Sequence, residues 1–417
     1  MEVRPGYKRT EVGVIPEDWN YTSIASVARL ESGHTPSKRK PSYWGGSVQW
    51  VSLHDTAALE DQEIAATAKT ITEDGLNHSS ARLLPAGTVV FSRTATVGKS
   101  TVMATSMATS QDFANYICGP ELHNHFLVHL FRGMGRTWQR FMAGSIHNTI
   151  YMPVFKALKI VLPPPPEQRA IAAALSDVDA LLGGLNRLIA KKRDLKQAAM
   201  QQLLTGQTRL SGFHSEWATE CLGDQVTRFV GGGTPSRGNP TYWGGEIPWV
   251  TVKDFATFDP QRTQESITSL GLESSSSHLI PAGTVITSTR MALGKTVIYD
   301  VDVAINQDLK ALFLKPCLFS EFLRFWFEYF GSSIDSLGSG STVKGISIAE
   351  LARFPFYRPA LQEQVAITAV LADMDAELAA LEARCDKTRT LKQGMMQELL
   401  TGRTRLIETK RESAAAC

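Results

Sequence analysis

The segment 35–50 reads TPSKRKPSYWGGSVQW, and the segment 234–249 repeats it as TPSRGNPTYWGGEIPW. The two copies are 234 − 35 = 199 residues apart. Later motifs recur at 281 − 85 = 196 residues, among them PAGTV at 85–89 and LLTG at 203–206. A repeat of this length is far longer than a solenoid unit, so it indicates a duplicated domain pair. We therefore predict two copies of one module, related by an internal pseudo-twofold axis.

Each module begins with short β-prone runs separated by turn residues, a pattern typical of a compact mixed α/β domain. The predicted strands are 48–53, 89–92 and 113–118 in the first copy and 247–252, 285–287 and 309–314 in the second. The repeated Tyr-Trp-Gly-Gly block predicts a packed aromatic residue beside a tight turn. Direct contact of this block with a base is the alternative.

Each module ends in a long stretch without proline, at 167–205 and 363–401, that is entered from proline and left through Thr-Gly. Apolar residues recur there at steps of four and three, which predicts a helix with a heptad seam. The seam consists of Ile171, Leu175, Val178, Leu182, Leu185 and Ile189 in the first copy and Ile367, Leu371, Met374, Leu378, Leu381 and Cys385 in the second. At about 1.5 Å per residue each helix is a rod of roughly 57 Å, longer than one ~34 Å turn of DNA.

These parts predict an α+β fold class: two globular mixed α/β domains, each followed by a long helix. We expect the two helices to pair as an antiparallel coiled coil, and the alternative is that each packs only on its own domain. The predicted boundaries are 1–162 and 207–358 for the domains, 163–206 and 359–402 for the helices, and 403–417 for a flexible tail. Two DNA-binding domains on such a rod could each recognise one short stretch of DNA, with a spacer between the stretches that neither domain reads.

Bulk properties of the chain exclude several classes of protein. Its 43 Lys and Arg nearly balance its 41 Asp and Glu, so any DNA-binding surface must be local. The five cysteines are scattered and never spaced as Cys-x-x-Cys, which argues against disulfides and structural zinc. No run approaches the roughly 20 apolar residues of a membrane span. We expect a cytoplasmic protein with no membrane partner.

Basic and amide side chains at or near matched positions of the two copies are candidates for contact with DNA. They are Lys38, Arg39, Arg93, Lys99 and Gln111 in the first copy and Arg237, Arg290, Lys295 and Gln307 in the second. The loops 145–149 and 338–344 differ strongly between the copies, so His147, Asn148 and Lys344 are candidates for base reading. For each residue the alternative is a solvated surface group.

The candidate catalytic and metal-binding motifs of the chain are incomplete, and no catalytic, cofactor-binding or metal-binding residue is predicted. Gly98-Lys99-Ser100 resembles the end of a phosphate-binding loop, but the glycine required five positions earlier is Arg93. The histidines at 123, 125 and 129 have metal-ligand spacing but are not repeated at 319, 321 and 325. We expect them on a surface or core helix.

Taken in order, the motifs of the chain resemble those of type I restriction-modification specificity subunits. The resemblance is carried by GVIPEDW at 13–19, the duplicated blocks, LPPPPEQ at 162–168, and LLTGxTRL at 203–210 and 399–406. The second copy departs from it at 211–217 and 358–361. The resemblance implies two target recognition domains that bind double-stranded DNA at a bipartite asymmetric site. It also implies helices that dock two adenine-methyltransferase subunits and can recruit nuclease-translocase subunits, with all chemistry and cofactors in those partners.

Two other functions remain open on the sequence. The chain could be a coiled-coil scaffold whose globular domains bind protein instead of DNA. It could also be a stand-alone enzyme with a fused nuclease or methyltransferase domain, although no catalytic motif supports that hypothesis. Divergence of the copies confined to loops favours a DNA-reading function over a scaffold.

Overall fold

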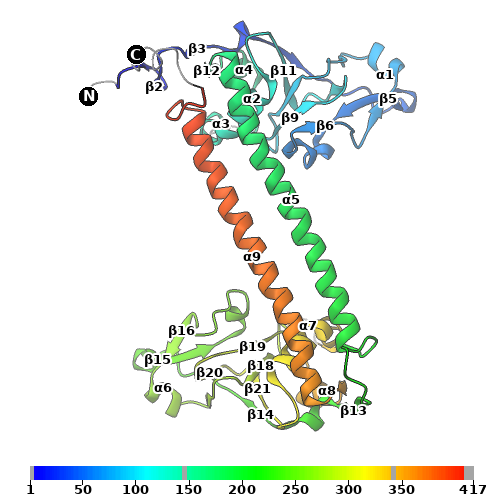
Figure 1. Ribbon diagram of the computed structural model, residues 1–417, viewed down its shortest axis with the longest axis vertical. Helices are drawn as coiled ribbons and strands as arrows, with labels where there is room; N and C mark the ends of the chain where they lie inside the picture. Colours follow the sequence, from blue (N-terminus) through cyan, green and yellow to red (C-terminus); the bar gives the residue numbers. More distant parts are fainter. Residues whose placement is uncertain (1–3, 143–147, 340–343, 408–417) are drawn as a thin grey trace. The chain divides into compact units, whose positions relative to one another are not determined.

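The computed structural model describes residues 4–142, 148–339 and 344–407 of the 417-residue chain. It divides into two compact units, one of Met1–Asn186 with Arg384–Cys417 and one of Arg187–Ala383. We call them unit 1 and unit 2. The boundaries fall inside both long helices, α5 (Pro165–Leu204) and α9 (Leu361–Leu399), so each unit holds part of each helix (Figure 1). Both helices confirm the sequence prediction to within two residues at each end.

Unit 1 contains two principal sheets. The larger has the strand order β4-β11-β8-β9-β6, and the smaller has the order β10-β5-β7. Their bounds are β4 Ala28–Ser32, β11 Phe113–Cys118, β8 Val89–Ser92, β9 Ser100–Met103, β6 Glu63–Ile64, β10 Ala108–Thr109, β5 Trp44–Val51 and β7 Thr70–Ile71. Two antiparallel pairs complete the strands: β1 (Tyr7–Thr10) with β2 (Gly13–Pro16), and β3 (Asn20–Ser23) with β12 (Lys159–Leu162).

Unit 2 repeats this arrangement. Its two principal sheets have the orders β14-β21-β18-β19 and β16-β15-β20-β17. The bounds are β14 Val226–Gly231, β21 Leu309–Leu314, β18 Val285–Ser288, β19 Thr296–Ile298, β16 Glu265–Ile267, β15 Trp243–Val250, β20 Val303–Ile305, β17 Leu279–Ile280, β13 Ala218–Cys221 and β22 Pro355–Arg358. The last two pair with each other. All six predicted strands are confirmed, although β5 and β15 begin four residues earlier than predicted and end two residues earlier.

Short helices pack beside these sheets in both units. They are α1 (Glu73–Asn77), α2 (Asn124–Gly133), α3 (Gly135–Met142) and α4 (Met152–Lys156) in unit 1, and α6 (Ser269–Glu273), α7 (Ser320–Leu337) and α8 (Ile348–Ala352) in unit 2. The continuous helix α7 stands where unit 1 has α2 and α3. Among the described residues, no helix is long and apolar enough to cross a membrane.

The repeated Tyr-Trp-Gly-Gly block packs its aromatic residue as predicted, but its two glycines lie in a strand at a register shift and not in a turn. Trp44 and Trp50 meet edge to face with ring centroids 5.0 Å apart, and their counterparts in unit 2 do so at 5.1 Å. Gly46 must be glycine because an added Cβ would lie 2.5 Å from the Cα of Thr72. Packing therefore explains why this block is repeated.

Each unit has an aromatic core that includes the ends of the long helices. In unit 1, Ile171 and Leu175 of α5 join a cluster that also contains Leu399. In unit 2, Leu203 of α5 and Ile367 of α9 share one cluster. Eight of the twelve predicted seam positions are buried: Ile171, Leu175, Leu185, Ile189, Ile367, Leu371, Leu378 and Cys385. The ends of the seam thus belong to the domain cores.

A buried ion pair joins the start of one long helix to the motif that follows the other, in each unit. In unit 1 the carboxylate of Glu167, with no exposed surface, accepts hydrogen bonds from Arg405 Nε at 2.6 Å and from Trp19 Nε1 at 2.8 Å. Burial alone would lower the pKa of Arg405, but hydrogen bonds to Glu167 and Asp18 raise it. The segment 403–407, predicted as the start of a flexible tail, is therefore held in place at Arg405.

The same ion pair recurs in unit 2. Glu363 is 1% exposed and accepts two hydrogen bonds from Arg209, of 2.5 and 2.6 Å, and one from Trp217 Nε1. The neighbouring glutamines also match: Gln168 and Gln364 each accept from the backbone N–H just before a helix at 2.8 Å. These contacts fix the angle at which each domain meets its helices.

Candidate nucleic-acid interface

One tight turn in each unit carries an unusual backbone conformation. It spans residues 93–98 between β8 and β9 in unit 1, and residues 289–294 between β18 and β19 in unit 2. Ala95 and Met291, which are 196 residues apart, have φ values of 60° and 65°. Such values are uncommon for residues other than glycine. The retention of this conformation in both copies indicates that the shape of the turn is needed.

Backbone hydrogen bonds define that shape as a γ-turn. The N–H of Thr96 donates to the carbonyl of Thr94 at 2.6 Å, and the N–H of Ala292 donates to that of Arg290 at 2.8 Å. A γ-turn with a positive φ at its central residue is rare and strained. A strained backbone persists only where the surrounding structure holds it in place. Such strain is found most often at sites that bind ligands.

The turn lies against the loop that differs between the two copies. Isolated β-bridges join Thr94 to Thr149 in unit 1 and Arg290 to Gly345 in unit 2. We name the resulting patches the reading surfaces: residues 93–98 with 148–150, and residues 289–294 with 344–345. The predicted residue His147 lies outside the described residues. Asn148, which is exposed and has φ +48°, belongs to the reading surface of unit 1.

Arg93 has a structural role in the reading surface of unit 1. Its Nε donates to the carbonyl of Gln111 at 2.9 Å, and its Nη1 donates to that of Ile150 at 3.1 Å. Burial lowers the pKa of Arg93. The guanidinium thus ties the turn to the divergent loop, and much of it is unavailable to a base. The matching residue Thr289 donates its hydroxyl to the carbonyl of Asp308 at 3.1 Å, which lies outside the divergent loop.

Arg290 has the opposite environment in the reading surface of unit 2. Its side chain is 60% exposed, and its nearest carboxylate, that of Asp308, is 3.6 Å away. Beside it, Met291 is 61% exposed, and its N–H donates to the carbonyl of Lys344 at 3.1 Å. Lys344 itself forms an ion pair with Asp335 at 2.6 Å. The exposed cation of this surface is therefore Arg290.

The two predicted glutamines lie next to the reading surfaces. Gln111 and Gln307 are exposed, and each accepts a hydrogen bond of 2.6 Å from a threonine hydroxyl, Thr35 or Thr234. The structure thus brings together Arg93, Gln111 and Asn148 in unit 1, and Arg290, Gln307 and Lys344 in unit 2. Matching threonine contacts hold the two glutamine side chains in the same way in both copies.

The remaining predicted residues stand apart from these groups. Lys38 and Arg39 are exposed on the loop before β5. Arg237 is occupied, because it pairs with Glu265 and stacks on Trp243 at 3.9 Å from the ring centroid. The hydrogen bond to Glu265 raises the pKa of Arg237. None of these three contacts the reading surface of its unit in the part of the chain that the structure describes.

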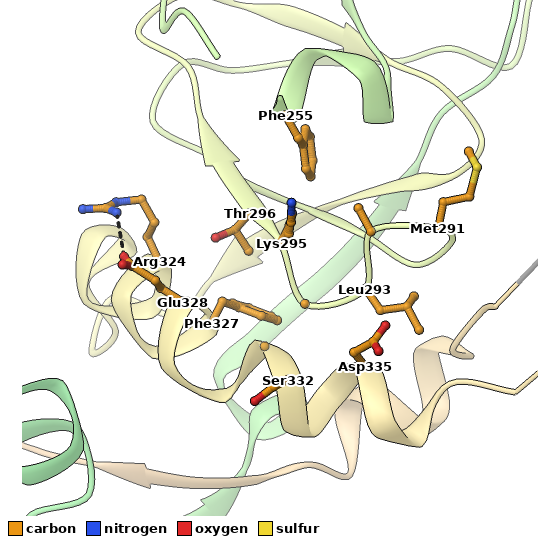
Figure 2. Close-up of a pocket in the computed structure, with 13 residues that line it drawn as sticks. Phe255, Met291, Leu293, Lys295, Thr296, Arg324, Phe327, Glu328, Ser332 and Asp335 are labelled. Atoms are coloured by element: carbon orange, nitrogen blue, oxygen red, sulfur yellow. Dashed lines mark ion pairs between the residues drawn. The ribbon is translucent and has the colours of Figure 1, made fainter. Parts of the chain in front are cut away.

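The matched lysines Lys99 and Lys295 differ in their surroundings. Lys99 forms an ion pair with Glu60 at 2.5 Å, whereas Lys295 is exposed and lies within 4.0 Å of no carboxylate among the described residues. Lys295 lines a cavity of about 610 Å³ between the turn and α7, together with Met291 and Phe327 (Figure 2).

One of the side chains that line this cavity differs between the copies in charge and in contacts. In unit 1 the guanidinium of Arg132 reaches from α2 to the carbonyls of Glu60, Asp61 and Ser100 at 2.8–2.9 Å. The position 196 residues later is Glu328, whose carboxylate pairs with Arg324 (Figure 2). It also pairs with Lys196. Unit 2 therefore has a glutamate beside this cavity where unit 1 has an arginine.

The three histidines lie on or beside α2, as predicted. His123 accepts a hydrogen bond from the N–H of Phe126 at 3.4 Å and so caps the helix. His129 is 2% exposed, and its Nε2 lies 3.1 Å from the hydroxyl of Ser176. Burial, aided by the nearby charge of Arg132, lowers the pKa of His129 to about 3. Within the described residues, no three His, Cys, Asp or Glu side chains are grouped as metal ligands.

The model of the type I restriction modification DNA specificity domain family matches the chain twice, over residues 16–191 and 214–388. The specificity subunit of the MjaIX type I restriction enzyme of Methanocaldococcus jannaschii is 26% identical over 59% of this chain and 60% of its own length. A putative MjaX specificity subunit of the same organism is 23% identical over 96% and 97%. The EcoR124I/EcoR124II specificity subunit of Escherichia coli is 26% identical over 55% and 58%. The matched region thus spans about three fifths of the first and third relatives.

Two solved structures share the fold. A chain from a study of complex assembly and conformational transition in the type I R-M system has a TM-score of 0.61 at 20% identity, covering 93% of this chain and 99% of its own. The S subunit of the type I restriction-modification system from M. genitalium has a TM-score of 0.56 at 14% identity, covering 96% and 98%. At these identities the likeness concerns the fold alone.

Proposed function

Because the chain belongs to the family of type I restriction-modification specificity subunits, we propose that each of its units reads one half of a bipartite, asymmetric DNA site. The observation that supports this most is the pair of reading surfaces, which have the same backbone but different side chains. Matched turns would place equivalent groups against both half-sites, while different side chains would select different bases. The recognition domains would be residues 1–162 and 207–358.

We infer that the halves of the two long helices pair as an antiparallel coiled coil with internal pseudo-twofold symmetry. Ion pairs within each unit support this pairing. Asp179 of α5 meets Lys392 of α9 at 2.5 Å in unit 1, and Lys196 meets Asp375 at 2.5 Å in unit 2. A paired rod, made of residues 163–206 and 359–402, would hold the two recognition domains at a fixed separation.

The outer face of α5 offers a place for a partner subunit. Leu188 and Leu195 in unit 2 are 39% and 46% exposed, and they are seven residues apart on one face of the helix. Exposed leucines at this interval are typical of a helix that packs against another protein. We propose that methyltransferase subunits, two per chain, dock along the helices and that nuclease-translocase subunits join them. Catalysis and its cofactors would reside in those partners, so this chain would not itself be an enzyme.

Selection from a library of randomised duplexes tests the DNA-reading function. The probe is the full chain assembled with a methyltransferase subunit, and the bound duplexes are sequenced after several rounds at a fixed salt concentration. We expect two short blocks of fixed bases separated by an unread spacer, with specific binding at least a thousandfold tighter than non-specific binding. Recovery of no preferred sequence would instead favour a protein-binding scaffold, and recovery of one continuous block would contradict a bipartite site.

A further inference from the structure

The strained turn in each unit presents one residue whose backbone is matched and whose side chain is not. Ala95 and Met291 occupy the same position of the repeat, have φ values within 5° of each other, and are both exposed. Neither is glycine or asparagine, the residues that adopt this conformation most readily. The strained conformation costs backbone energy, yet both copies have it although their side chains at this position differ. This indicates a position that presents its side chain to a ligand.

The side chain at this position is an apolar group in a polar setting. Met291 is 61% exposed and follows Arg290, whose side chain is 60% exposed. A large exposed apolar residue beside an exposed cation suits a surface that meets both the phosphates and the base edges of DNA. The apolar feature of a base edge in the major groove is the C5-methyl group of thymine.

Room for such a contact exists on one side of Met291. It lines the cavity beside the reading surface of unit 2, which Glu328 also lines (Figure 2). A methionine side chain is unbranched and flexible, so it can shift toward this space and adapt to a methyl group that approaches the turn. The main-chain hydrogen bond from Met291 to Lys344 keeps the turn itself fixed while the side chain adapts.

We propose that Met291 contacts the methyl group of a thymine in the half-site read by unit 2, and so helps to determine that half-site. This inference rests on the proposed function and adds to it a named residue and a named chemical group on the DNA. The contact is direct and apolar, and it is distinct from the polar contact that Arg290 beside it would make.

A thermodynamic cycle between protein and DNA tests the contact. In the selected duplex, each thymine of the half-site is replaced in turn by deoxyuridine, which lacks only the methyl group. Binding is measured with wild-type complex and with the Met291→Ala variant. We expect one position at which deoxyuridine weakens wild-type binding about fourfold, the effect of one buried methyl group. At that position Met291→Ala has the same loss with thymine and no further loss with deoxyuridine.

Two controls make the result specific. Alanine stands at the matched position 95, so Met291→Ala is compatible with the turn, and its melting temperature is expected to equal that of the wild type. Leu270→Ala removes another exposed apolar side chain of unit 2, 52% exposed on α6, and should retain the fourfold dependence on the methyl group.

The possible failures are distinguishable. A specific complex whose half-site has no thymine, or in which Met291→Ala keeps its sensitivity to deoxyuridine, overturns this inference and leaves the proposed function standing. A wild-type complex that prefers no sequence overturns the proposed function and this inference with it.

Discussion

Replacement of Arg405 by alanine is expected to lower the free energy of unfolding of unit 1 by about 3–5 kcal/mol. The carboxylate of Glu167 has no exposed surface, and without Arg405 it would keep only the hydrogen bond from Trp19 Nε1. A buried charge that loses its partner retains the cost of desolvation without the compensating attraction. Urea denaturation followed by tryptophan fluorescence measures the change, because Trp19 lies at the ion pair.

Matched variants separate this effect from the mere loss of a surface cation. Lys159→Ala removes a pair with Glu11 in which the side chains are 47% and 72% exposed, and it should cost less than about 1 kcal/mol. Arg209→Ala breaks the equivalent pair with Glu363 and should destabilise unit 2 by a similar amount to Arg405→Ala in unit 1. If Arg405→Ala were as stable as Lys159→Ala, the ion pair would not anchor the helix start.

Replacement of Arg290 by alanine is expected to weaken specific DNA binding by the assembled complex about 10- to 100-fold. The guanidinium is 60% exposed, and its only close carboxylate among the described residues is 3.6 Å away, so little protein structure depends on it. The loss should be confined to the half-site read by unit 2. Equilibrium titration with duplexes in which either half-site is scrambled measures it at a fixed salt concentration.

The salt dependence of the same titration identifies the group that Arg290 contacts. If it contacts a phosphate, the slope of log affinity against log salt should fall by about one in the variant, whereas contact with a base leaves the slope nearly unchanged. Arg228→Ala is the control, because Arg228 is also an exposed arginine of unit 2 but lies on β14, over the ring of Phe313. Equal affinities of the two variants for the cognate duplex would remove Arg290 from the interface.

The fold could be predicted from the sequence because the duplication makes each strand and helix pattern occur twice. The strands at 89–92 and 309–314 were found from their β-prone composition, and both long helices from proline boundaries and heptad periodicity. The early start of β5 at Trp44 was missed, since its Gly-Gly pair looks like a turn until the register shift before Val48 is seen.

The candidate site could be predicted only in part. Arg93 was singled out as a DNA contact, yet its guanidinium binds backbone carbonyls of Gln111 and Ile150, which residue type and spacing cannot show. The strained turn at Met291 was missed because no glycine or asparagine marks it.

The ion pairs at the helix starts were missed for a different reason. Glu167 and Arg405 are 238 residues apart, and in the sequence each stands out only as part of a repeated motif. A signal was present, because glutamate and arginine of opposite charge recur together at the repeat offset, as Glu363 and Arg209 do. The repeat does not show which glutamate pairs with which arginine, since each glutamate pairs with the arginine of the other copy.

Sequencing of methylated adenines in cells that carry this chain with its methyltransferase partner tests the central claim most directly. Two reading surfaces with one backbone and different side chains predict a single methylated motif made of two different short blocks, separated by a spacer of fixed length. A strain that carries the methyltransferase alone should lack this motif. A continuous motif, or a methylome unchanged by the presence of this chain, would contradict the account.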